Sequence, residues 1–169
     1  MKRTLVDPIK RSDLTGAFLA YLGPLLDLEG ILLGRGTAPP GGGWPATVNG
    51  SGRGIFTPYV VLKAGMASTT APGERDALST NATSWLVSYQ VTTHDVSESK
   101  VDTSADVLRP ILIGFGRDVG QITLGGIDWA LQQVTVPRLG ATTVTRATDP
   151  PHWQVSDDVS LHLSRVSRV

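Results

Sequence analysis

The clearest pattern in the chain is the alternation of apolar and polar residues in "TSWLVSYQVTTHD", residues 83–95. Side chains of a β-strand point to opposite faces in turn, so strict alternation predicts a half-buried strand. The apolar positions are Trp85, Val87, Tyr89 and Val91, and the opposite face is polar except at Leu86. We therefore expect one face of this strand to be buried and the other to face solvent.

Two segments instead show apolar residues at helical spacing. The first has Leu14, Ala17, Phe18, Tyr21, Leu22 and Leu25, with Ser12 or Asp13 available as N-cap. The second has Val101, Ala105, Leu108 and Leu112, with Asp95 and Glu98 spaced as a capping box. Pro24 and Pro110 lie inside these patterns, and each is expected to kink or end its helix because proline lacks the N–H donor.

Further strands are expected in "LEGILLG" and "TPYVVLKAG", and short strands in "IDWALQQVTVPRLG", "TTVTRA" and "SDDVSLHLSRV". The order of helix, strands, helix and strands predicts an α+β fold with a small mixed, mostly antiparallel sheet. Two main helices are expected to pack on that sheet. No repeat or convincing linker divides the chain, so we expect one domain over residues 1–169.

Long loops rich in glycine and proline are expected between these elements. Residues 35–53, with "GGGWPATVNGSGRG", cannot sustain a helix or a strand ladder, and we expect a flexible loop there. Residues 66–81 are predicted to form a second loop. Loops of this length in a compact domain are either functional or disordered.

Composition limits the possible functions. Fifteen basic and fifteen acidic residues cancel, so the chain as a whole has no bulk attraction to nucleic acid or an anionic membrane. The absence of cysteine excludes disulfides and thiolate nucleophiles. The most apolar window, residues 16–34, contains Pro24, Asp27 and Glu29, so no membrane-spanning helix and no membrane partner are expected.

No motif predicts catalysis. The glycine-rich stretch lacks the lysine of a phosphate-binding loop and leads into a strand, so we expect no nucleotide site. His94, His152 and His162 lie in separate segments without metal-ligand spacing. His94 and Asp95 are adjacent, but neighbours on a strand face opposite ways, and the pair Asp157–Asp158 is expected at a solvated turn. The chain is therefore predicted to be no enzyme and to need no metal or cofactor, with a small hydrolase using His94 and Asp95 as the weaker alternative.

Two tryptophans, Trp44 and Trp153, fall in predicted loops. Large aromatic residues are favoured anchors of protein interfaces, but a loop can also fold back so that its tryptophan caps the core of its own domain. Both interpretations stay open at this point. The candidate interface residues are Trp44, Arg53, Phe56 and Trp153.

Three longer stretches carry a family resemblance: "GGGWP…GSGRGIFTPYVVLKAG", "SWLVSYQVTTHDVSESKVDTSADVLRPIL" and the closing "PPHWQVSDDVSLHLSRV". In order and spacing they resemble tail terminator (tail completion) proteins of long-tailed, non-contractile phages, the members from actinobacterial phages most of all. The resemblance covers most of the chain. Pro110 and "DVSES" depart from it, because a more regular and arginine-richer helix is expected there.

The resemblance implies a structural virion protein. Such proteins form a hexameric ring on the head-proximal end of the tail tube, end tube polymerisation and present a surface to the head connector. The implied partners are further copies of the chain, the major tail tube protein, and a head–tail connector or stopper protein, while genomic DNA passes through the lumen without specific binding. The implied location is the head–tail junction of the virion, and the host cytoplasm during assembly. Another neck protein, a stopper or connector, is the nearest alternative.

Overall fold

The computed structural model describes residues 9–45, 54–69, 84–146 and 150–166. In chain order the elements are α1 (Arg11–Leu28), β1 (Leu32–Arg35), β2 (Tyr59–Thr69), β3 (Ser84–Asp95), α2 (Glu98–Val119), β4 (Gln121–Leu124), β5 (Ile127–Arg138), β6 (Thr143–Thr145) and β7 (His152–Arg165).

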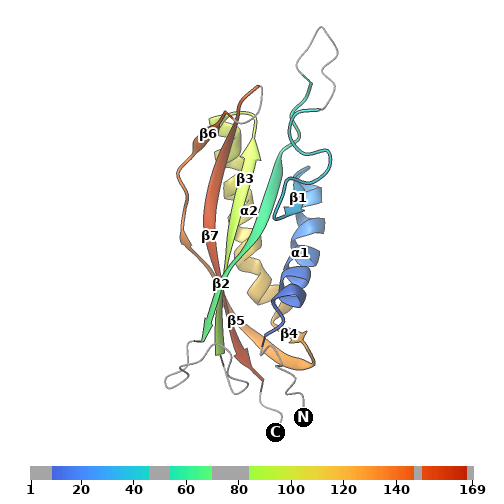
Figure 1. The fold of residues 1–169 in the computed structure, drawn as a ribbon, viewed down its shortest axis with the longest axis vertical. Helices are drawn as coiled ribbons and strands as arrows, with labels where there is room; N and C mark the ends of the chain where they lie inside the picture. The colour runs from blue at the N-terminus through green and yellow to red at the C-terminus, as the bar shows by residue number, and fades with distance from the viewer. Residues whose placement is uncertain (1–8, 46–53, 70–83, 147–149, 167–169) are drawn as a thin grey trace, which may run out of the picture.

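All described strands join one sheet of order β1-β2-β3-β7-β5-β4, in which β6 also pairs with β7. Every pairing is antiparallel except that of β1 with β2. Both helices lie along the same side of this sheet (Figure 1). The predicted α+β fold, a mixed and mostly antiparallel sheet packed by two main helices, is confirmed.

The core lies between the helices and one face of the sheet. Phe18 of α1 is fully buried and contacts Tyr89 of β3 and Phe115 of α2, with ring centroids 5.4 and 4.6 Å apart. The hydroxyls of Thr15 and Tyr89 lie 3.0 Å apart, which satisfies the polar end of the buried tyrosine. The alternating apolar residues of β3 all face this core, as their spacing predicts: Trp85, Val87, Tyr89 and Val91.

Both helices continue through their prolines, so of the two expected effects, a kink or an early end, the early end is wrong. Pro24 lies inside α1 and Pro110 inside α2, which runs nine residues further, to Val119. Fully buried leucines on both sides of each proline, such as Leu108 and Leu112, anchor the helix to the sheet. Tertiary packing therefore outweighs the hydrogen bond that each proline removes.

The start of α2 differs from the predicted capping box. Ser97 is the N-cap, and its hydroxyl accepts a hydrogen bond from the Lys100 backbone N–H at 3.3 Å. The Asp95 carboxylate instead accepts from the Val96 N–H at 2.7 Å and from the Ser104 hydroxyl at 2.9 Å. Asp95 thus fixes the turn between β3 and α2 from inside the fold.

Several strands are longer than the sequence predicted. β2 continues to Thr69, so the predicted loop over residues 66–81 begins later, and its remainder lies outside the described residues. β5 has 12 residues and β7 has 14, where short strands were expected. β7 pairs with β3 from Trp153 to Ser164, so it forms the centre of the sheet.

Candidate functional site

The sheet face opposite the helices carries mostly uncharged polar side chains, and we call it the open face. Across β3 and β7 its paired positions include Ser84 with Ser164, Ser88 with Ser160, and Thr92 with Ser156. The Thr92 and Ser156 hydroxyls lie 2.9 Å apart. Short hydroxyl side chains on neighbouring strands therefore make this face polar without adding charge.

Few charged groups interrupt the open face among the described residues. Lys63 lies on β2, while Arg138 of β5 and Asp158 of β7 line one shallow hollow together. The remaining titratable side chains of this face include His94 and His162. The open face is therefore close to neutral as well as polar.

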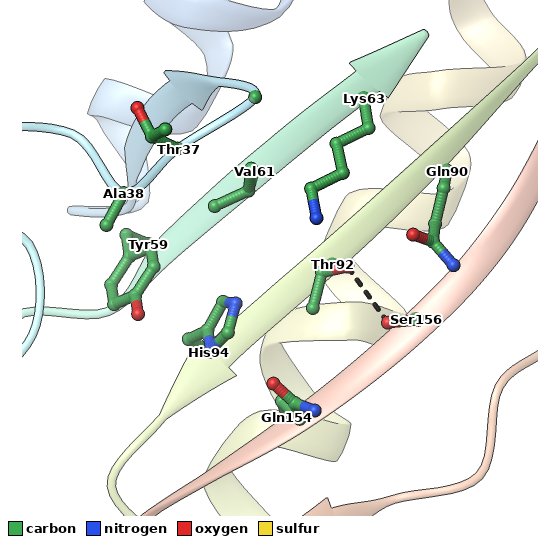
Figure 2. A pocket seen from close by; sticks show the side chains of 11 residues that line it. Thr37, Ala38, Tyr59, Val61, Lys63, Gln90, Thr92, His94, Gln154 and Ser156 are labelled. Carbon is green, nitrogen blue, oxygen red and sulfur yellow. Dashed lines mark hydrogen bonds between the residues drawn. The ribbon is translucent and has the colours of Figure 1, made fainter. Parts of the chain in front are cut away.

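A pocket of about 380 Å³ opens on this face between β2, β3 and β7 (Figure 2). Residues Gly36, Thr37 and Ala38, which follow β1, form one wall. The floor comes from alternate residues of three strands: Tyr59, Val61, Lys63, Gln90, Thr92, His94, Gln154 and Ser156. Hydroxyl, amide, imidazole and ammonium groups thus converge on a single concave surface.

His94 at the end of this pocket is held by two rings. Its Nδ1 lies 3.0 Å from Nε2 of His152, and its ring stacks on Tyr59 with centroids 4.4 Å apart and an interplanar angle of 11°. A neutral imidazole has one donor and one acceptor nitrogen, so two neutral rings can share one proton in this bond. The pair joins the end of β3 to the start of β7.

Burial favours the neutral forms of these rings. It lowers the pKa of His94 from 6.5 to about 4, with the nearby His152 and Lys63 acting in the same direction. Burial also lowers the pKa of His152. A base whose pKa is near 4 is a poor proton acceptor at neutral pH, so the geometry gives little support to acid–base catalysis at His94.

The predicted interface residues Trp44 and Phe56 join the two histidines in one aromatic cluster. Trp44 packs edge-on against Phe56 with centroids 5.2 Å apart, and Phe56 lies 5.4 Å from the His152 ring. A bridge between Gly43 and Thr57 holds the two loop segments together. Within a single chain, Trp44 therefore folds back onto its own domain, the second of the two interpretations left open by the sequence.

The other two predicted interface residues lie elsewhere. Trp153 packs on a small cluster of Val101, Ala105 and Val155, away from Trp44, and is half-buried. Arg53 lies outside the described residues. A single chain does not test contacts between chains, so the interface role of all four residues stays a prediction.

The adjacent His94 and Asp95 face opposite sides of the sheet, as strand geometry predicts: His94 lines the open face and Asp95 bonds to the start of α2. Among the described residues, His94 has no hydrogen bond to a serine, a threonine or a carboxylate. No group of three or more side chains suited to a metal ion occurs in the described part of the chain.

Asp157 is not at a solvated turn, which corrects the sequence-based expectation. It lies within β7 with 1% of its surface exposed, and its carboxylate accepts two hydrogen bonds from Arg109, at 2.9 and 3.2 Å, and one from the Gly140 N–H. The hydrogen bond from Arg109 to Asp157 raises the pKa of the arginine. This buried ion pair ties α2 to the centre of the sheet.

Sequence reasoning missed the pairing of His94 with His152. The two residues are 58 positions apart, and their contact depends on the register that places His94 opposite Gln154, two residues from His152. No local pattern specifies that register. Of the two histidines, only His152 has a proline and an aromatic residue beside it, Pro151 and Trp153, while the neighbours of His94 are Thr93 and Asp95, so the sequence offers no signal shared by the pair.

No family model matches the chain, and no curated protein matches it. A solved structure is similar over 95% of this chain and 98% of its own, with a TM-score of 0.53 and 14% sequence identity. That protein carries only a sequence identifier as its name. At this identity the likeness shows a shared fold and nothing about activity. Within the described residues, neither helix is long and apolar enough to cross a membrane.

Proposed function

We propose that the chain is a structural subunit of a ring at the head–tail junction of a long-tailed phage, where it caps the head-proximal end of the tail tube. The observation that carries the proposal is the open face: a broad sheet surface, bare of helices among the described elements, covered by hydroxyl and amide side chains and nearly free of charge. The resemblance of most of the chain to tail terminator proteins supports the same function.

In the proposed ring the open face lines the lumen. A channel that passes DNA must not hold it, and affinity for DNA rises with the number of phosphates that lysine and arginine neutralise. Ser88, Ser160 and the bonded pair Thr92–Ser156 offer hydroxyls but no cations to passing phosphates. Such a wall leaves DNA free to slide.

The subunits of the ring meet through two different surfaces of each copy, because a closed ring of identical chains with one contact type is head-to-tail. Trp44 and Trp153 are the proposed anchors of contacts with neighbouring copies or the tube, since both stay half-buried within one chain. The further partners are the major tail tube protein on one side of the ring and the head connector or stopper on the other. During assembly the chain acts in the host cytoplasm and afterwards in the virion.

Negative-stain microscopy of the purified chain with purified tail tubes tests the proposal. Sixfold rings and caps at one end of each tube are expected. A chain that stays monomeric at high concentration and never caps a tube would overturn the proposal. Binding to heads without binding to tubes would identify a different neck protein.

The lumen assignment has its own test. A Gln90→Arg variant, which changes an exposed side chain of the open face, should still form rings but should bind double-stranded DNA in a salt-dependent manner. The matched control is an arginine at Thr103, which lies exposed on α2 on the other side of the sheet. Equal DNA binding by both variants' rings would place the open face outside the lumen.

A further inference from the structure

Strand β2 extends well beyond its partner β1. The pairing with β1 covers Tyr59 to Leu62 and ends with a 2.8 Å hydrogen bond from the Gly36 N–H to the Leu62 carbonyl. On its other side, β2 stays paired with β3 out to Thr69. Residues 63–69 therefore form an edge that no other described strand covers, and we call it the β2 edge. Such an edge is a template for an added strand.

The β2 edge is held in a fixed shape. Its register with β3 shifts between Ala64 and Ala67, and the Ser88 hydroxyl both accepts from the Met66 N–H at 2.9 Å and donates to the Met66 carbonyl at 3.0 Å. From α1, Arg11 donates a hydrogen bond to the Gly65 carbonyl. The edge is therefore ordered before a strand is added, and the Gly65 carbonyl, already bonded to Arg11, is not an acceptor that the added strand would use.

Two hollows flank the point where β1 ends. One is the 380 Å³ pocket on the open face, and the other, of about 520 Å³, is lined by Thr15, Arg35, Gly36, Leu62, Lys63 and Ala64. Gly36 and Lys63 belong to both hollows. No acidic residue is among the described residues that line either one.

Two cations lie beside this edge without a carboxylate partner in the described part of the chain. Arg35 and Lys63 are both exposed, and neither forms an ion pair with any described residue. Asp27 of α1 lines a neighbouring hollow with Arg35 but makes no ion pair with it. Arg35 and Lys63, neither paired with a described carboxylate, thus lie beside the β2 edge, with Arg11 bonded to the Gly65 carbonyl from α1.

The two cations lie on opposite faces of the sheet. Lys63 projects over the open face toward the pocket of His94 (Figure 2). Leu33 of β1 packs on the main core between sheet and helices, so strand alternation places Arg35 on that helix-covered side. Because side chains of an added strand also alternate, two consecutive acidic residues would each meet one cation.

We propose that the β2 edge binds an extended segment of a partner protein that carries two consecutive acidic residues. The segment adds a strand beside residues 63–69 and continues the line of β1. Backbone hydrogen bonds supply affinity, and the carboxylates paired with Lys63 and Arg35 supply specificity, as in other complexes formed by strand addition. The proposal rests on this edge alone and holds whether or not the chain forms a ring.

The test uses three fluorescently labelled six-residue peptides that differ only at the two central positions. The first is threonine-valine-glutamate-glutamate-valine-threonine, and the other two carry glutamine pairs or lysine pairs in place of the glutamates. Fluorescence anisotropy with the full chain at low salt should show about tenfold tighter binding of the glutamate peptide than of the glutamine peptide. Added salt should reduce that preference.

Variants then locate the binding. Arg35→Glu with Lys63→Glu should abolish the preference for glutamate and favour the lysine peptide. Arg35→Gln with Lys63→Gln, a milder change, should remove the preference without reversing it. Arg138→Glu is the matched control, because Arg138 lies across the sheet in β5, and it should leave binding unchanged. Amide chemical shifts in NMR spectra should change at residues 63–68 when the glutamate peptide binds.

Several results would overturn the proposal. They are equal binding of the glutamate and glutamine peptides, a preference that persists in both double variants, or no binding of any peptide. In the last case Lys63 only protects the edge from aggregation, a common role of edge lysines. A short double-stranded DNA with the same charge as the glutamate peptide is tested in the same way. If it binds more tightly than the peptide and the double variants lose that binding, the partner is a nucleic acid and not an acidic segment. All these measurements use the isolated chain, so their failure leaves the ring proposal intact, and the absence of rings leaves this one intact.

Discussion

Acidification should destabilise the fold through His94. Above about pH 6.5 the imidazole is neutral in both the folded and the unfolded chain, so it adds no pH dependence. As the pH falls from 6.5 toward 4, His94 becomes protonated in the unfolded chain but stays neutral in the folded chain. The reason is that burial and the neighbouring His152 and Lys63 lower its folded pKa to about 4. Stability is therefore lost across this window, and below it the effect is complete.

The size of the effect follows from the difference in proton affinity. Each tenfold difference is worth about 1.4 kcal/mol, so the lowered pKa sets an upper limit of about 3 kcal/mol. His94 is only half-buried, and solvent screens part of this. We expect a loss of about 1–2 kcal/mol in the free energy of unfolding between neutral pH and about pH 4.

Urea unfolding followed by tryptophan fluorescence, repeated from about pH 7.5 to about pH 4.5, measures this loss. Because carboxylates also titrate at the acid end, the decisive quantity is the difference between the natural chain and a His94→Gln variant. The variant should lose the pH-dependent part, and a His162→Gln control on the same sheet face should keep it. Identical pH profiles for the natural chain and His94→Gln would show that His94 does not cause the loss of stability on acidification.

Three further predictions concern packing, each measured by urea unfolding. Gly140→Ala should lower the free energy of unfolding by at least about 2 kcal/mol, because the new Cβ would overlap the Ser156 carbonyl. In contrast, a Cβ at Gly16 would have nothing within 4 Å, so Gly16→Ala should stabilise α1 by about 0.5–1 kcal/mol. Asp157→Asn should lower the free energy of unfolding by about 2–4 kcal/mol, because it leaves Arg109 without its buried partner. Arg117→Gln removes an exposed ion pair and should leave the free energy of unfolding unchanged. Trp44→Ala should lower the free energy of unfolding by about 1–3 kcal/mol even in a monomeric chain, because the Trp44 ring packs against Phe56 of the same chain. An unchanged free energy of unfolding would mean that this packing does not stabilise the monomer.

The elements of the fold could largely be predicted from local patterns. Alternation identified β3 and its buried face, and helical spacing identified most of the residues by which α1 and α2 contact the sheet, although in α1 Leu26 is fully buried and the predicted Ala17 and Leu25 are not part of the core. The element ends were less predictable, because they depend on long-range packing. Pro110 illustrates this: its effect on the helix depends on whether Leu108 and Leu112 are both held by the sheet, and the local sequence does not specify that.

The candidate site was much less predictable. From its local sequence Asp157 is predicted to be solvated. It is buried because α2 packs over β7, where Arg109 of α2 donates a hydrogen bond to its carboxylate. Likewise, His94 and His152 become partners only through the pairing of β3 with β7. In both cases the chemistry arises from residues about fifty positions apart, so their meeting depends on topology rather than on motif.

The positions of the predicted interface residues also determine how their role can be measured. Phe56 is 7% exposed and packs between Trp44 and His152, so Phe56→Ala would weaken the chain itself and would reveal little about contacts with a neighbour. Trp44 and Trp153 keep part of their surface accessible, so either can contact a second chain without leaving its own cluster. An interface role therefore requires that a substitution at Trp44 or Trp153 reduce the free energy of assembly by more than it reduces the free energy of unfolding of the isolated chain. A substitution whose effect on assembly equals its effect on stability would assign that tryptophan to its own domain alone.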